Sequence, residues 1–174
     1  MVLCSPLAVL ISAMTRHYSF VIEEASYMRL CHTKKILTVN GQFSGPTIEA
    51  RKSDTIMGRV YNRAGHGVEQ PRNPWSDGPE YVTQCPIQPG TNFTYTILFS
   101  EEEGTLWRHA HNDWNRATVI VHPRCGTTFP SLKPYKEIPI ILGEWWMANV
   151  SEVIEDALRT DGGRPKLFDA FTIR

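Results

Sequence analysis

The sequence predicts an all-β protein in which short strands build a sandwich or barrel, with one short helix near the carboxyl end. Between Phe93 and Phe99, large apolar side chains occupy every second position, which is typical of a strand with one face in a core. Turn motifs containing glycine or proline separate this run from several similar ones. Many short strands joined by such turns favour a sandwich or barrel over a helical fold.

The elements follow in order along the chain. Period-two runs predict strands at 17–22, 35–39, 55–61, 93–99, 104–111, 117–121 and 138–142. Turns are expected at 40–41, 44–46, 77–79 and 88–90. The only helix pattern runs from Val150 to Arg159, with Asn149 as N-cap, Glu152 three residues later, and Gly162-Gly163 as the stop.

Length and charge restrict the possible functions. The 174 residues suffice for one ordinary β domain and the start of a second. Lys plus Arg equals Asp plus Glu at 18 each, so no charge excess favours binding to nucleic acid or to an anionic membrane.

The amino-terminal segment predicts secretion. Residues 2–14 form an apolar run that is too short to cross a bilayer but has the length of a leader core, with a small-residue cleavage signal at Ile11-Ser12-Ala13. Residues 1–13 are therefore expected to be a signal peptide, and the alternative is a buried first strand. The sequons at Asn92 and Asn149 predict N-glycosylation of a secreted chain.

Four cysteines stand at positions 4, 31, 85 and 125, without the paired spacing of a metal site. Removal of Cys4 with the leader leaves an odd number. At least one thiol is then expected to lack an internal partner in an oxidising compartment.

His109-Ala110-His111 is the strongest candidate for a metal site. Alternate residues of a strand share a face, so both imidazoles are expected to project the same way. Two imidazoles on one face are typical metal ligands.

Four segments resemble the first cupredoxin domain of plant laccases, which are blue multicopper oxidases; they are 37–48, 75–90, 104–111 and 138–146. The resemblance implies a cupredoxin-like Greek-key β-sandwich or barrel with a short helix near the carboxyl end. It divides the chain into a possible signal peptide at 1–13, an incomplete first cupredoxin domain at 14–135, and a linker with the start of a second cupredoxin domain at 136–174.

The resemblance also implies a function. Laccases are secreted to the apoplast, oxidise phenols and monolignols by single electrons, act on lignin, and reduce O2 to water at a trinuclear copper cluster. By this resemblance His109 and His111 match the second His-x-His motif of the cluster, and His66 matches the second histidine of the first motif. Neutral imidazole suits copper in both oxidation states, so copper is the expected cofactor.

The chain departs from the family at two internal points and at its end. Gly65 follows Ala64 where the family has the first cluster histidine and a short strand before it, and a second contraction follows Thr118. Each contraction is expected to remove strand pairing near the metal site. No cysteine has histidines at the spacing of a blue copper, so the chain alone is expected to be inactive.

Two other functions remain open at the level of sequence. One is a mononuclear zinc enzyme with His66, His109 and His111 as ligands. The other is a non-catalytic, secreted copper-binding cupredoxin fragment.

The remaining distinctive residues are expected to have ordinary roles. His17, His32 and His122 are expected at the surface or at strand ends, and Glu101-Glu102-Glu103 in a solvated turn. The five tryptophans, at 75, 107, 114, 145 and 146, are expected to pack in the core. By analogy with the family, Cys31 and Cys85 are disulfide halves whose partners lie beyond this chain.

Overall fold

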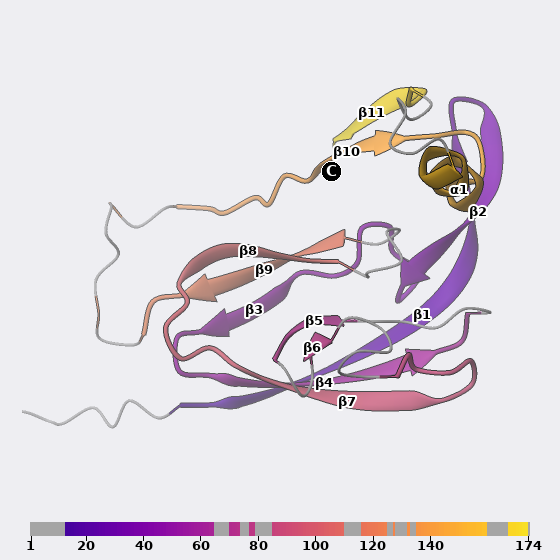
Figure 1. Ribbon diagram of the computed structural model, residues 1–174. Helices are drawn as coiled ribbons and strands as arrows, with labels where there is room; N and C mark the ends of the chain where they lie inside the picture. Colours follow the sequence, from indigo (N-terminus) through magenta and orange to yellow (C-terminus); the bar gives the residue numbers. More distant parts are fainter. Residues whose placement is uncertain are drawn as a thin grey trace, which may run out of the picture.

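Two β-sheets lie face to face in the computed structural model, which describes residues 13–64, 70–73, 77–78, 85–109, 116–124, 127, 132, 135–159 and 167–173 (Figure 1). The first sheet has the order β2 (His32–Val39), β1 (Thr15–Arg29), β4 (Thr55–Asn62) and β7 (Asn92–Leu98). The second has the order β3 (Ile48–Arg51), β9 (Arg116–His122) and β8 (Gly104–His109). The predicted all-β sandwich is therefore confirmed.

The long strand β1 pairs with a different neighbour along each half. Its first half, Thr15 to Ile22, runs parallel to β4, and its second half, from Ile22 to Arg29, pairs antiparallel with β2. Leu30 and Cys31 close the β1–β2 hairpin with φ of 52° and 58°. Parallel pairing recurs between β3 and β9, and since parallel neighbours cannot be joined by a hairpin, the chain passes through the other sheet between them.

The core lies between the two sheets and follows strand alternation. Large apolar side chains at alternate positions face inward from both sheets, and the buried cluster comprises Phe20, Ile22, Val39, Ile48, Ala50, Ile56, Val60, Ala64, Ile87, Tyr95, Phe99, Val119 and Val121. Burial of this apolar surface is the main stabilising term of the sandwich.

The prediction of a strand at 138–142 is wrong in position. Regular pairing begins only at Leu142, where β10 (Leu142–Trp145) pairs antiparallel with β11 (Ala170–Ile173). Pro139 explains the shift, because proline has no N–H to donate to a sheet ladder. No strand was predicted at β3, at β11 or at β5 (Gln70–Asn73). The turn expected at 77–79 is wrong at its first two residues, because Asp77 and Gly78 form β6 and pair antiparallel with β5.

The predicted helix is confirmed with the expected bounds as α1 (Val150–Arg159). The Asn149 side-chain oxygen accepts a hydrogen bond from the Ser151 N–H at 3.1 Å, which is the expected N-cap. Val153 is its buried anchor. The expected stop at Gly162-Gly163 lies outside the described residues.

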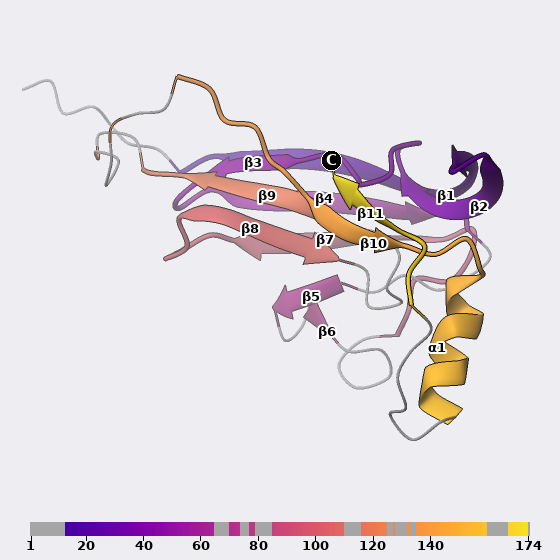
Figure 2. The ribbon, with the colours of Figure 1, turned by 90° about the horizontal axis from the view of Figure 1, so that it is seen from above.

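The carboxyl-terminal elements β10, β11 and α1 lie beside the end of the β1–β2 hairpin (Figures 1 and 2). The rings of Tyr27, Phe43 and Trp145 form a cluster with centroid separations of 5.6 to 5.9 Å. The Lys34 ammonium lies 4.3 Å from the Trp145 ring centroid and donates to the Trp146 carbonyl. An aromatic and cation–π contact therefore joins this region to the sandwich.

Strand pairing around the two sequence contractions is retained. β4 pairs on both sides, with β1 and β7, through Tyr61, and β9 pairs with both β8 and β3. Pairing is thus present in the described strands next to the contractions, with β3 covering only Val119 to His122 of β9, and the loss expected next to Gly65 falls on residues outside the described ones.

Candidate functional site

Strand β8 carries the first histidine of the candidate metal pair. It begins at Gly104 and ends at His109, which pairs in register with Arg116 of β9. Leu106 packs against the core, whereas Trp107 points outward with 63% of its surface exposed. Alternation gives position 109 the same face as position 107. His111 and the side chain of His109 lie outside the described residues.

His66 also lies outside the described residues, but both of its flanks are described. Ala64, just before it, belongs to the buried core, and β5, which starts shortly after it, contacts β8. The described chain thus stops in the core at Ala64 and resumes at Gln70 in β5, which contacts β8.

Asn62 fixes the start of this segment, and sequence reasoning did not identify it. Its side chain is 1% exposed, donates to the Ile87 carbonyl at 2.7 Å, and accepts from the Ala64 N–H at 3.0 Å. Its backbone exchanges hydrogen bonds with the turn at Gly90 and Thr91. A buried amide that satisfies groups on two segments holds them in one arrangement. An asparagine that ends a strand one residue before a turn is the available sequence signal.

Arg108 is a half-buried cation next to the candidate pair. Its guanidinium lies 4.6 Å from the Phe20 ring centroid and donates to the Pro46 carbonyl at 3.1 Å. Its Nε has no hydrogen-bond partner, and burial lowers its pKa to about 10. Gly45 permits this approach because it has no side chain. A Cβ at that position would lie only 3.3 Å from the Arg108 Nη2 and would crowd it. The end of β8 is thus tied to β1 and to the 44–46 turn.

The described part of the chain contains no group of three histidine, cysteine, aspartate or glutamate side chains able to hold a metal ion. His17 and His32 are exposed, and His122 ends β9, 4.0 Å from the Glu49 carboxylate and 3.9 Å from that of Glu137. These three histidines therefore have the surface and strand-end positions that the sequence predicted.

The described cysteines are unpaired within this structure. Cys31 and Cys85 are both free and exposed, whereas Cys4 and Cys125 lie outside the described residues. No disulfide therefore joins Cys31 to Cys85.

The three described tryptophans differ in burial, and Trp146 is half-buried, with its ring centroid 6.3 Å from that of Phe168. Trp145 is 3% exposed, as expected for a core residue, but the expectation for Trp107 is wrong because that side chain points to solvent. Arg108 occupies the inward position of β8 beside it, which turns Trp107 outward. Trp75 and Trp114 lie outside the described residues. The predicted solvated turn at 101–103 is confirmed, with Lys52 near the carboxylates of Glu101 and Glu103.

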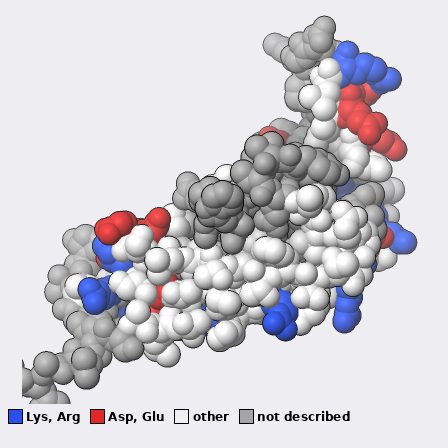
Figure 3. Space-filling view, turned by 60° about the horizontal axis from the view of Figure 1, so that its bottom comes forward, with Lys and Arg blue, Asp and Glu red and all other residues white. Residues whose placement is uncertain are grey.

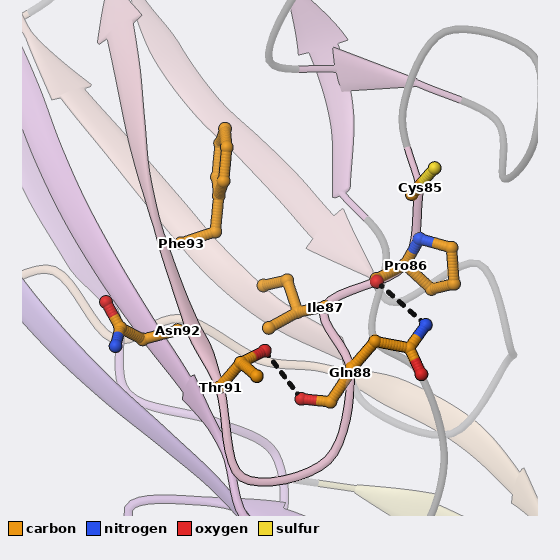
Figure 4. A pocket seen from close by; sticks show the side chains of 7 residues that line it. All are labelled: Cys85, Pro86, Ile87, Gln88, Thr91, Asn92 and Phe93. Atoms are coloured by element: carbon orange, nitrogen blue, oxygen red, sulfur yellow. Dashed lines mark hydrogen bonds between the residues drawn. The ribbon is translucent and has the colours of Figure 1, made fainter.

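A cavity of about 310 Å³ lies at the turn before β7, lined by Cys85, Pro86, Ile87, Gln88, Thr91, Asn92 and Phe93 (Figure 4). Hydrogen bonds from Thr91 to the Gln88 carbonyl and from Gln88 to the Pro86 carbonyl shape its rim. Its lining is mostly apolar, and the Cys85 thiol is its one side chain with nucleophilic chemistry. The described cavity therefore does not hold an acid–base pair or a metal ligand set.

Charged side chains on the face shown in Figure 3 occur in small separate groups of both signs. None of the described helices is long and apolar enough to serve as a membrane span.

Comparisons with known proteins give the family. The model of the multicopper oxidase family matches residues 21–123. Two rice proteins from Oryza sativa subsp. japonica are similar: putative laccase-9 is 60% identical over 83% of this chain and 27% of that protein, and laccase-21 is 57% identical over 91% of this chain and 29% of that protein.

Solved structures agree on the fold. The crystal structure of laccase from Botrytis aclada superposes with a TM-score of 0.76 and 26% identity over 93% of this chain and 31% of that chain. This chain spans less than a third of the length of these laccase relatives. Its cupredoxin-like β-sandwich and its sequence show that the chain belongs to the multicopper oxidase family and corresponds to an amino-terminal cupredoxin domain of the plant laccase type.

Proposed function

We propose that this chain supplies part of the copper centre of a laccase-like multicopper oxidase. The observation that carries the proposal is the position of His109 at the end of β8, in contact with β5, the strand that follows His66 in the chain. The family match covers all of these elements.

The proposed ligands are His66, His109 and His111. The donor set fits copper, because imidazole binds this metal in both oxidation states. Asn62 and Arg108 are positioning residues and not ligands. Asn62 fixes the chain before His66, and Arg108 fixes the strand before His109. When bound, copper supplies one-electron redox chemistry that protein side chains lack.

The proposed reaction of the complete enzyme is the removal of single electrons from phenols or monolignols, with the electrons and released protons reducing O2 to water. The oxidised phenols or monolignols then serve the formation or the breakdown of lignin. The chain described here contributes ligands to the O2-reducing cluster. Electron entry at a blue copper is assigned to the remaining length of such an enzyme, because no cysteine of this sequence has histidines at the spacing of a blue-copper site.

The proposed location is the extracellular space, the apoplast in a plant, after removal of residues 1–13 as a signal peptide. Two exposed sequons support it. Asn92 begins β7 at the surface and Asn149 lies exposed before α1, so both are accessible for N-glycosylation.

The proposed domain division places the first cupredoxin domain at 14–135. The two-sheet sandwich occupies this range, and the separate β10–β11 pair and α1 lie in 136–174. The second range is then a linker followed by the start of a second domain.

Copper titration tests the ligand assignment. Purified protein is titrated with Cu(II) and with Zn(II), and bound metal is quantified by mass spectrometry and by the copper electron paramagnetic resonance signal. Wild type is expected to bind copper with nitrogen hyperfine structure, and His109→Ala/His111→Ala is expected to lose it. His17→Ala/His32→Ala is the matched control, because it removes two exposed histidines elsewhere.

Equal copper uptake by wild type and His109→Ala/His111→Ala would contradict the assignment. Stoichiometric zinc without copper would instead support a mononuclear zinc site. Loss of phenol-dependent O2 consumption on introducing the same pair of changes into the full-length enzyme tests the reaction itself.

A further inference from the structure

Asp54 is a buried carboxylate that contacts the first residues of the described chain. It lies in the turn between β3 and β4, is 3% exposed, and accepts three hydrogen bonds. The Arg16 Nε donates at 2.7 Å, the Arg51 N–H at 3.0 Å, and the Met14 backbone nitrogen at 3.0 Å to the other carboxylate oxygen. Burial by itself raises the pKa of Asp54, but these three donors outweigh it and hold the pKa below its ordinary value.

Met14 is also the residue at which the sandwich begins. Its carbonyl accepts from the Thr55 N–H at 2.9 Å, and β1 starts at the next residue. The small-residue cleavage signal ends at Ala13, so the bond expected to be cut joins Ala13 to Met14. The nitrogen that this cut would release is the one that already lies 3.0 Å from the Asp54 carboxylate.

We propose that cleavage after Ala13 converts the Met14 nitrogen into an α-ammonium group that forms an ion pair with Asp54, so that leader removal adds a charged contact to the fold. The inference rests on the proposed secretory leader. It goes further in naming the acceptor of the new amino terminus and the stability gained from it.

The covalent step is a hydrolysis by a leader peptidase. Water adds across the Ala13–Met14 amide, the leader leaves as the Ala13 carboxylate, and the Met14 amine takes up a proton. One of its three N–H bonds continues to point at Asp54. The other two reach water, because Met14 is 56% exposed.

The groups near Asp54 act in both directions on a second cation: Arg16, already bound to this carboxylate, opposes it, and the strength of an ammonium as a donor favours it. Arg16 is the cation already bound to Asp54, and its own pKa is raised chiefly by the hydrogen bond to that carboxylate. Electrostatic interaction with Tyr18 and Glu49 also raises the pKa of Arg16. The Arg51 side chain donates to the Pro123 carbonyl. The Lys52 ammonium lies near the carboxylates of Glu101 and Glu103. A charged donor on a buried carboxylate forms a stronger hydrogen bond than a peptide N–H.

The pH dependence has a definite sign. Pairing with Asp54 raises the pKa of the ammonium above the value of about 7.7 to 8.0 of a free amino terminus. Its contribution is therefore complete below that value and is lost as pH rises through the folded-state pKa. Asp54 stays ionised throughout this range, since its pKa is lowered.

The first arm of the test secretes the full chain from a eukaryotic host and determines the amino terminus by intact mass and peptide sequencing. A product that starts at Met14 is expected. Retention of residues 1–13 would overturn both the proposed leader and this inference, whereas a start at another residue would overturn this inference and move the leader boundary.

The second arm compares chains beginning at Met14 and at Ser12, each released without a scar from a cleavable fusion. At about pH 6.5 the Met14 chain is expected to melt roughly 2 to 4 °C higher, and the difference is expected to vanish near pH 10. Asp54→Asn should abolish the difference, and Glu49→Gln, which changes a nearby exposed carboxylate, should leave it.

A secreted product that starts at Met14 combined with equal melting of the two chains at all pH values would overturn the ion pair and leave the leader in place. The wild-type pair of chains decides this even if the Asp54→Asn protein does not fold.

Discussion

At the scale of single residues, two tryptophans show how tertiary surroundings decide a side chain's role. Trp145 is buried by Tyr27, Phe43 and Lys34, whereas Trp107 is exposed beside the inward-facing Arg108. Sequence alone does not separate the two, because each is a large aromatic residue expected to pack in the core. The difference follows from what lies against each strand face.

Trp145→Ala is expected to destabilise the protein by about 3 to 5 kcal/mol, because it leaves a cavity in the aromatic cluster and removes the ring under Lys34. Urea unfolding monitored by circular dichroism measures the loss. Trp107→Ala is the matched control, and a change of less than about 0.5 kcal/mol is expected for an exposed side chain. Equal destabilisation by Trp145→Ala and Trp107→Ala would contradict the assignment of Trp145 to the core and of Trp107 to the surface.

At the scale of elements, helix α1 was predictable and strand β10 was not. The bounds of α1 follow from local signals, namely the Asn149 cap and the apolar spacing that buries Val153. The position of β10 depends on β11, some 25 residues later, since a strand needs a partner to form its ladder. Pro139 interrupted a run whose composition alone indicated a strand.

Asn149 has two proposed roles that substitutions can separate. In a host without N-glycosylation, Asn149→Ala is expected to lower stability by about 1 kcal/mol, since it removes the cap, and Asn149→Asp is expected to retain stability. Thermal unfolding measures both. Ser151→Ala destroys the sequon but keeps the capping side chain, so it should match wild type here.

In a glycosylating host, wild type is expected to carry glycan at Asn149, and both Asn149→Asp and Ser151→Ala should lack it by mass. A Ser151→Ala protein as unstable as Asn149→Ala in the first host would contradict the assigned cap.

At the scale of the whole molecule, Asp54 connects the start of β1 with the β3–β4 turn and so links the two sheets. Its folded-state pKa is lowered, so its stabilising contribution is present above the unfolded carboxyl pKa of about 3.9 and is lost as pH falls through the folded value. The ion pair itself contributes only part of this, because a third of the Arg16 side chain is exposed.

Asp54→Asn is expected to lower stability near neutral pH by roughly 2 to 3 kcal/mol and to flatten the acid dependence below about pH 4. Urea midpoints across this range measure both effects. Glu49→Gln is the control for an exposed carboxylate and should keep the wild-type slope. An unchanged slope in Asp54→Asn would show that other carboxylates govern acid unfolding.

The sequence by itself determined the β class, the position of most strands, helix α1 and the family, because period-two alternation, turn residues and a cap are local signals. The ligand residues His66, His109 and His111 also came from sequence and stay a prediction.

Only the tertiary structure decided how distant segments meet. Asn62 fixes the start of the His66 segment through Ile87 and Ala64, and Arg108 reaches Phe20 and Pro46 from inside β8. Asp54 collects donors from two separate stretches of chain. Such contacts depend on which faces of two sheets oppose each other, and no local pattern encodes that.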